Sequence, residues 1–362
     1  MKKALITGIT GQDGAYLAKY LLEKNYKVFG TFRRTSTPNF WRLENLGIFP
    51  KVNLIPADLL DMGSMIESIK VSDPDEIYNL AAASFVSTAF EQPVGNAEIT
   101  GTAVTKLLEA IRFYDKKIKF YQASTSEMYG NSNTTIQNEK TPFSPASPYA
   151  AAKLYAHEMT EVYREAYGIF TATGILFNHE SPLRGLEFVS RKISNGVAQI
   201  ALGLKKKIIL GNLNAKRDWG YAPEYVKAMH LMLQQKKPNT FVISTGETHS
   251  VKEFVKLAFE IVGLDWKKYT SIDKRFFRPL EVNYLRGDYS HAKKVLKWKP
   301  TVTFSKLVEI MVNDDLKRWK MFLNGERFAW DAPLYPSEFK IITRTSEENN
   351  KYTRKRTTKI KK

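Results

Sequence analysis

The N-terminal stretch constrains the fold of this chain more than any other part of the sequence. Residues 4–6 have the apolar character of a short buried strand, Gly8, Gly11 and Gly14 form a GxxGxxG turn, and residues 15–22 continue with helical apolar spacing. A helix that starts directly after a glycine turn points backbone N–H groups and its positive dipole end at an anion. The glycines also let a pyrophosphate approach the backbone closely. The stretch therefore predicts a dinucleotide site, although a plain tight turn has the same glycines.

Strand and helix patterns alternate through the first half of the chain. Apolar runs typical of strands lie at residues 28–32, 52–56, 76–81, 118–123 and 169–176. Helical patterns begin near residue 64 and cover residues 96–114 and 149–167. Such alternation is typical of a parallel sheet with helices on both faces, whose strands end at one common edge. We expect an α/β fold, a Rossmann-type doubly wound parallel sheet that binds its ligands at that edge.

The character of the sequence changes after residue 177, which predicts a second lobe. The following residues are more basic and mixed, with a strand near 208–210 and helices at 251–262 and 304–322. We expect a smaller, discontinuous α/β substrate lobe beside the dinucleotide-binding domain. The expected boundaries are 1–177 for the Rossmann domain, which returns near 212–245, then 178–211 and 246–335 for the second lobe, and 336–362 for a basic tail.

Composition narrows the class of protein further. The 362 residues include no cysteine, which fits a reducing compartment, and no apolar run approaches the length that spans a bilayer. No secretory signal pattern precedes the first strand, so we expect a cytoplasmic protein without membrane contact. The five histidines have no metal-ligand spacing, and we expect no metal site.

The net charge of +18 suits anionic ligands such as nucleotides. Residues 350–362 contribute seven basic residues and no acidic ones. We interpret this tail as a disordered, solvated end rather than a binding segment. The charge by itself does not indicate nucleic acid.

The second strand ends in Gly-Thr-Phe-Arg-Arg at residues 30–34, where a dinucleotide site contacts the adenosine ribose. An acidic residue at this place would bind the 2′-hydroxyl of NAD. Arg33 and Arg34 instead suit a 2′-phosphate through charge-assisted hydrogen bonds, which favours NADP. The alternative is a solvated basic loop.

Two segments carry candidate chemistry, residues 122–129 after the fourth strand of the alternation and residues 147–153 at the start of a long helix. Tyr149 and Lys153 share one face of that helix. A neighbouring ammonium favours the phenolate and would make Tyr149 a usable base near neutral pH. The same spacing occurs at Tyr20/Lys24 and Tyr289/Lys293, which we interpret as ordinary surface pairs because only the middle pair lies where the sheet edge would deliver it.

A resemblance now becomes specific. The chain resembles the GDP-mannose 4,6-dehydratases, members of the extended short-chain dehydrogenase/reductase superfamily, from residue 1 to about residue 320. The motifs that carry the resemblance are Gly8-Ile-Thr-Gly-Gln-Asp-Gly14, Ala123-Ser-Thr-Ser-Glu-Met-Tyr-Gly130, Ser147-Pro-Tyr149 with Lys153, Leu176-Phe-Asn-His-Glu-Ser-Pro182 and Arg217-Asp-Trp-Gly220.

The resemblance implies four catalytic residues. Thr125 would hydrogen-bond the sugar O4, Tyr149 would take the O4 proton during C4 oxidation by NADP, and Lys153 would hold the nicotinamide ribose. Glu127 would remove the C5 proton and assist loss of the C6 hydroxyl as water, before hydride returns to C6. The implied product is a GDP-4-keto-6-deoxy sugar. A carboxylate two residues after Thr125 also supplies the extra acid and base that an elimination needs; the alternative is a surface glutamate that caps a nearby turn.

The resemblance also implies two sets of binding residues, which overlap at the catalytic centre. Arginine and lysine suit a pyrophosphate, and a carboxylate suits the N–H donors of guanine. The residues implied for the NADP cofactor are Gly8, Thr10, Gly11, Gln12, Asp13, Gly14, Arg33, Arg34, Asp58, Leu59, Leu80, Ala82, Ser84, Tyr149, Lys153, His179 and Arg184. Those implied for the GDP-sugar are Ser84, Thr125, Glu127, Asn178, Lys192, Arg217, Arg278 and Glu281.

The loop at residues 33–43 predicts an assembly. In the family that the chain resembles, this loop reaches the cofactor of a neighbouring subunit. Here it carries Phe40 and Trp41 among three arginines, and exposed aromatic residues beside arginines are common at interfaces. We expect a homodimer or homotetramer, which sedimentation can check.

Three departures from the family pattern leave the sugar open. The sequence Ala83-Ser-Phe-Val86 replaces Gln-Ser-His-Val, Gly95 replaces a tyrosine, and Leu183 replaces an arginine. Either these changes accommodate a sugar other than mannose, such as GDP-manno-heptose or a GDP-N-acetylhexosamine, or the positions merely pack and have drifted. Residues 325–336 lie beyond the resemblance and carry no assigned role.

Two further readings compete with a dehydratase. A nucleotide-sugar epimerase or reductase needs Tyr149 and Lys153 with a serine or threonine, but it has no use for Glu127. A non-catalytic protein that binds NADP or nucleic acid has only the basic charge in its favour, and such binding would fall steeply with salt.

Overall fold

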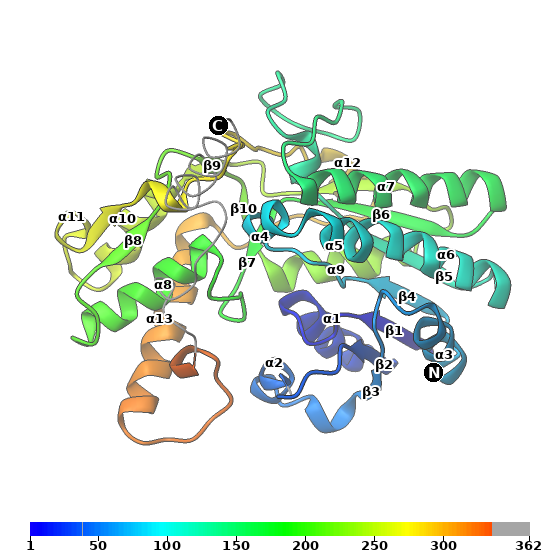
Figure 1. Ribbon diagram of the computed structural model, residues 1–362, viewed down its shortest axis with the longest axis horizontal. Coiled ribbons are helices and arrows are strands. Elements are labelled where there is room, and N and C mark those ends of the chain that lie inside the picture. The colour runs from blue at the N-terminus through cyan, green and yellow to red at the C-terminus, as the bar shows by residue number, and fades with distance from the viewer. Residues whose placement is uncertain (38, 335–362) are drawn as a thin grey trace, which may run out of the picture.

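The computed structural model describes residues 1–37 and 39–334 (Figure 1). The basic tail expected at residues 336–362 lies outside the described residues. Within these two ranges, no helix is long and apolar enough to cross a membrane.

A seven-stranded parallel sheet forms the larger part of the molecule, in the strand order β11-β6-β5-β4-β1-β2-β3. Its members are β1 (Lys3–Thr7), β2 (Lys27–Phe32), β3 (Asn53–Pro56), β4 (Glu76–Asn79), β5 (Lys119–Thr125), β6 (Thr171–Leu176) and β11 (Thr240–Ile243). The strand order reverses at β1, which lies between β2 and β4. This is the Rossmann-type doubly wound arrangement that the alternation predicts, and its switch point is where ligands of such sheets bind.

Helices cover both faces of the sheet because side chains alternate along each strand. On β1, Ala4 and Ile6 pack with α1 (Gln12–Glu23) and α9 (Ala222–Leu233), whereas Leu5 points to the opposite face. That opposite face packs against α3 (Met62–Ser72), α6 (Ala103–Tyr114) and α7 (Pro148–Tyr167). Two apolar cores therefore sandwich the sheet.

A second group of helices gathers at one end of the molecule, on the left in Figure 1. Its main helices are α8 (Val189–Ala201), α10 (Val251–Ile261) and α13 (Phe304–Leu323), which share one apolar core with β8 (Ile208–Leu210). The strand β8 pairs in parallel with β13 (Thr270–Ile272). Between this lobe and the sheet, β7 (Asn178–Glu180) pairs with β10 (Trp219–Tyr221). The chain returns to the sheet at β11, which pairs with β6.

The helix predicted at residues 96–114 is interrupted. It consists of α5 (Pro93–Ala97), a wide π-helical turn at Glu98–Thr102, and α6. Gly101 lies in the wide turn against α7, where a Cβ atom would come 3.3 Å from the carbonyl oxygen of Ala152. The close approach of two helices, which periodicity does not reveal, explains the change of helix type.

Candidate functional site

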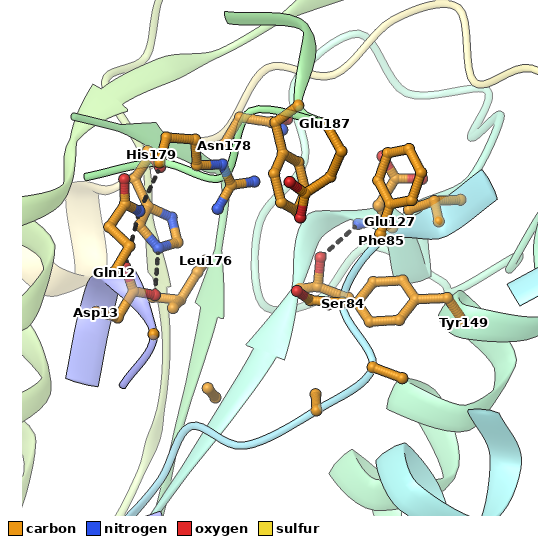
Figure 2. Close-up of a pocket in the computed structure, with 18 of the residues that line it drawn as sticks. Gln12, Asp13, Ser84, Phe85, Glu127, Tyr149, Leu176, Asn178, His179 and Glu187 are labelled. Carbon is orange, nitrogen blue, oxygen red and sulfur yellow. Dashed lines mark hydrogen bonds and ion pairs between the residues drawn. The ribbon is translucent and has the colours of Figure 1, made fainter. Parts of the chain in front are cut away.

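A cavity of about 660 Å³ opens at the carboxyl edge of the sheet and extends toward the second lobe. Its walls come from the loops after β1, β2, β4, β5 and β6 and from the region of α8, Arg217 and residues 276–281. All of the site residues predicted from the sequence line this cavity except Arg34. Figure 2 shows Glu127 and Tyr149 on one side of it and Asp13 and His179 on the other. The topology therefore brings together two predicted sets that lie far apart in the chain.

The glycine turn fits an anionic phosphate group. Gly8 has a positive φ of 70°, and a Cβ atom there would lie 2.9 Å from Cα of Ala81. A Cβ atom on Gly14 would lie 2.4 Å from the Gly8 carbonyl oxygen. No side chain caps the N-terminus of α1, whose N-cap residue is Gly11. The first turn of this helix therefore offers backbone N–H groups to the cavity, as binding of a pyrophosphate requires.

The two arginines after β2 differ in position. Both Arg33 and Arg34 are exposed, but only Arg33 lines the cavity, together with Asp58 and Leu59 from the loop after β3. Of the two arginines, only Arg33 therefore lies where it can reach a ligand in the cavity.

Tyr149 enters the cavity from the first turn of α7. Ser147 caps that helix by accepting a hydrogen bond from the Ala150 N–H, and Pro148 occupies the first helical position. Tyr149 is 8% exposed, and burial raises its pKa, with the nearby Glu127 carboxylate raising it further and the Thr125 hydroxyl lowering it. The cap and the proline therefore fix the phenol beside Thr125 and Glu127.

Lys153 is buried one turn further along α7. Its Nζ donates a hydrogen bond to the Ala123 carbonyl at 2.7 Å and lies 5.9 Å from the centre of the Tyr149 ring. Burial lowers the pKa of Lys153 to about 8. The expected lowering of the Tyr149 pKa by this ammonium is not found, because burial dominates and moves that pKa upward. Sequence spacing placed the pair correctly on one helix face but could not reveal how deeply it is buried.

Glu127 points into the cavity from the short helical turn Ser126–Tyr129 that follows β5. It is 7% exposed, so the alternative of an exposed turn-capping glutamate is wrong. Its Oε1 lies 3.6 Å from Nη1 of Arg278 and 4.0 Å from Nε of Arg217. Arg217 also pairs with Glu281 at 3.2 Å. The acid expected to act on the sugar therefore lies beside the cations expected to bind the diphosphate.

The glycine-turn motif and the motif around His179 contact each other. Nε2 of His179 lies 2.7 Å from the Asp13 carboxylate, and its Nδ1 lies 2.7 Å from the Phe177 carbonyl oxygen. Both partners only accept hydrogen bonds, an arrangement that favours the doubly protonated, cationic ring. The Asp13 carboxylate correspondingly raises the pKa of His179 against the effect of burial.

Gln12 adds a second bridge between the same two motifs. Its Nε2 donates to the His179 carbonyl at 3.1 Å, and its Oε1 accepts from the Ser181 hydroxyl at 2.7 Å. Gln12 thus links the glycine turn to β7 and Ser181, and it also lines the cavity. Ser181 was not predicted, although its place in the second motif was a usable signal.

Sequence reasoning also missed an aromatic part of the cavity wall. The rings of Phe85 and Phe188 lie edge to face at 5.6 Å, and the Arg184 guanidinium lies 3.6 Å from the centre of the Phe188 ring. Glu187 lines the cavity beside them (Figure 2). No motif marks Glu187 or Phe188, but both follow Arg184 closely, and Phe85 was visible as a departure from the family pattern.

The exposed aromatic residues expected in the loop at 33–43 are not found. Trp41, in α2 (Trp41–Asn45), is 8% exposed and packs beneath two guanidiniums, those of Arg42 at 4.5 Å and Arg318 at 5.6 Å from its ring centre. Phe40 is half-buried against Phe32 and Phe49. The expected homodimer or homotetramer is therefore not supported by exposed aromatic residues in this loop, and it stays a prediction.

Comparison with known proteins gives consistent matches. Residues 5–311 match the family described as GDP-mannose 4,6 dehydratase. The chain is 52% identical over 337 residues to GDP-mannose 4,6 dehydratase 2 of Arabidopsis thaliana, with 90% of each chain covered. It is 47% identical over 339 residues to the GDP-mannose 4,6 dehydratase of Homo sapiens, covering 87% of this chain and 91% of the human protein.

Solved structures show the same fold at lower identity. A dTDP-glucose 4,6-dehydratase from Bacillus anthracis in complex with NAD superposes with a TM-score of 0.76 at 22% identity, covering 88% of this chain and 98% of that one. The protein RMD from Pseudomonas aeruginosa in complex with NADPH gives a TM-score of 0.72 at 21% identity, covering 87% and 99%.

Proposed function

The chain belongs to the GDP-mannose 4,6-dehydratase family, and we propose that it converts GDP-mannose to a GDP-4-keto-6-deoxy sugar with loss of one water. The activity is that of a nucleotide-sugar 4,6-dehydratase, a hydro-lyase. The observation that carries the proposal is the Glu127 carboxylate, which shares one cavity with Thr125 and Tyr149. An elimination needs an acid or base besides the oxidising pair, and an epimerase or reductase does not.

The residues around the glycine turn would hold an NADP cofactor. The uncapped start of α1 suits the pyrophosphate, and Arg33 suits a 2′-phosphate. A related structure contains NADPH and another contains NAD, so the relatives alone leave the choice open. When bound, the nicotinamide supplies the hydride acceptor for C4 and the hydride donor for C6.

The chain's own side chains account for the proton movements. Tyr149 takes the O4 proton while the Thr125 hydroxyl holds that oxygen. Glu127 removes the C5 proton and returns a proton to the departing C6 hydroxyl. Asn178, Lys192, Arg217 and Arg278 would bind the diphosphate end, and Glu281 would accept from guanine.

Two residues that depart from the family pattern, Ala83 and Phe85, line the cavity. Leu183, which is 1% exposed, and Gly95 do not line it. At the two lining positions the chain has a small side chain and an apolar ring where the family has glutamine and histidine. This observation keeps GDP-manno-heptose and GDP-N-acetylhexosamines as second candidates behind GDP-mannose.

A panel of nucleotide sugars tests the proposal directly. We expect the purified protein with NADP to convert GDP-mannose to a product lighter by one water, detected by mass spectrometry. GDP-manno-heptose and GDP-N-acetylhexosamines serve as the alternatives, and UDP-, CDP- and dTDP-sugars serve as controls. Dehydration of a control sugar but of no GDP-sugar would overturn the assignment.

The cofactor choice gives a matched pair of variants. Arg33→Ala is expected to weaken NADP binding about tenfold and NAD binding by less than about twofold, because only NADP carries the phosphate that a guanidinium binds. Arg34→Ala is the control, since Arg34 does not line the cavity. Titration of the wild type and of both variants with NAD and with NADP measures the affinities that are compared. Equal effects of the two variants, or a wild-type preference for NAD, would refute the proposed contact.

A further inference from the structure

Part of the segment at residues 325–336, for which the sequence indicates no role, packs behind residues that line the cavity. We call residues 328–332 the C-terminal strap. Trp330 in the strap is 8% exposed and lies edge to face with Trp319 of α13 at 4.6 Å. Trp330 and Ala332 share an apolar cluster with Leu186 and Ala198. The strap therefore touches α8, α13 and the loop that precedes α8.

That loop, residues 182–188, is here called the wall loop because Arg184, Glu187 and Phe188 line the cavity. Two guanidiniums from outside the loop hold three of its carbonyl groups in succession. Nη1 of Arg191 donates to the carbonyls of Pro182 at 2.5 Å and of Arg184 at 2.9 Å.

The carbonyl between these two, that of Leu183, is held by Arg42 of α2. Nε of Arg42 donates to the Leu183 carbonyl at 2.7 Å, and Nη1 of the same side chain donates to the Thr10 carbonyl at 3.2 Å. Arg42 thereby links the wall loop to the glycine turn. A shift of this guanidinium would therefore affect both the wall loop and the glycine turn.

The positive charges of these guanidiniums are offset by carboxylates that do not line the cavity. Arg191 is fully buried and pairs with Asp315 of α13, which is also fully buried. Asp331 of the strap lies 3.8 Å from Nη2 of Arg191. Burial lowers the pKa of Arg42 to about 10, and the Asp331 carboxylate opposes that effect. Removal of one carboxylate leaves the guanidiniums without enough nearby negative charge to offset the free-energy cost of their burial.

Further charged groups surround these residues. Arg318 pairs with Asp314 on α13 and lies over Trp41. The guanidiniums of Arg42, Arg191 and Arg318 thus lie near the three carboxylates of Asp314, Asp315 and Asp331, and Arg184 and Glu187 of the wall loop also act on Arg42. Asp331 is the only one of the three carboxylates that does not belong to α13.

We propose that the C-terminal strap positions the ligand site: Asp331 balances Arg42 and Arg191, which in turn fix the wall loop and the glycine turn for nucleotide binding. Asp331 is a positioning residue, not a catalytic one, because the strap does not line the cavity. The functional part of this inference rests on the proposed dehydratase activity. The structural part, that the strap controls the wall loop, does not.

Amide hydrogen exchange tests the structural part. Within the wall loop, the N–H groups of Arg184 and Phe188 donate to the carbonyls of Ser181 and Gly185, so their exchange reports opening of the loop. Asp331→Asn is expected to speed exchange there about tenfold, and Asp331→Glu to restore it. Glu309→Gln is the matched control, since it removes a carboxylate from an exposed pair with Lys306 on α13. Unchanged exchange in Asp331→Asn, or an equal change in Glu309→Gln, would overturn the inference.

Steady-state kinetics test the functional part. Asp331→Asn is expected to raise the KM for the GDP-sugar and the Kd for NADPH about tenfold with kcat within about twofold, because Thr125 and Tyr149 are on β5 and α7. If Asp331→Asn does not fold, Arg42→Lys replaces it in the test. This variant keeps the positive charge but loses the guanidinium that bonds two carbonyls, and it should also raise KM and Kd with little change in kcat. If Asp331→Asn lowered the unfolding midpoint but kept the wild-type ligand affinities and the wild-type amide exchange of the wall loop, the strap would only stabilise the fold. Faster exchange in a protein without dehydratase activity would refute the proposed function and leave the strap's control of the loop intact.

Discussion

Replacement of Glu127 by glutamine is expected to abolish formation of the 6-deoxy product while the first oxidation still proceeds. Glutamine keeps the size and hydrogen bonds of the side chain but cannot accept the C5 proton. Loss of a general acid or base costs about 10²- to 10⁴-fold in rate. Absorbance of the reduced nicotinamide should therefore appear without product, and C5 should no longer exchange with deuterated solvent.

Glu281→Gln is the matched control for this variant, because Glu281 and Glu127 both pair with Arg217. If Glu281 binds the base, its replacement should raise KM and leave kcat nearly unchanged. The assignment of Glu127 would be lost if Glu127→Gln made product at the wild-type rate. It would also be lost if both glutamine variants behaved alike.

Local patterns were sufficient to predict the sheet. Ala4, Leu5 and Ile6 are apolar on both faces of β1, as expected for a strand covered by helices on each side, and the glycine turn follows at once. Local patterns also predict where the catalytic segments lie, because parallel strands end at one edge of the sheet. The predicted residues that follow these strands line the cavity for this reason, except Arg34, whereas Lys192, Arg217, Arg278 and Glu281 reach it from outside the sheet.

Contacts between distant residues could not be predicted in this way. The sequence marks Asp13 and His179 as cofactor residues, but only the fold reveals that they pair with each other. The arginines around Trp41 predict an exposed interface residue, yet Arg318 of α13 covers its ring. The raised pKa of Tyr149 could not be predicted for the same reason. Sequence spacing shows which residues share a helix face, but it does not show how far burial keeps water from them.

Tyr149→Phe is expected to block the reaction one step earlier than Glu127→Gln. The ring remains, so the GDP-sugar should still bind, but nothing accepts the O4 proton, and oxidation should fall about 10²- to 10⁴-fold. No reduced nicotinamide should accumulate in this variant. Accumulation equal to that in Glu127→Gln would mean that another group takes the proton.

The pH dependence of the first oxidation distinguishes Tyr149 from other bases. Burial and the Glu127 carboxylate raise the pKa of Tyr149, so the wild-type rate in single turnover should increase as the pH rises. Glu127→Gln removes a negative charge that disfavours the phenolate, which lowers this pKa and should shift the profile to lower pH. Thr125→Val removes the hydroxyl that lowers the pKa and should shift the profile to higher pH. If the two variants shifted the profile in the same direction, or not at all, Tyr149 would not be the group that titrates.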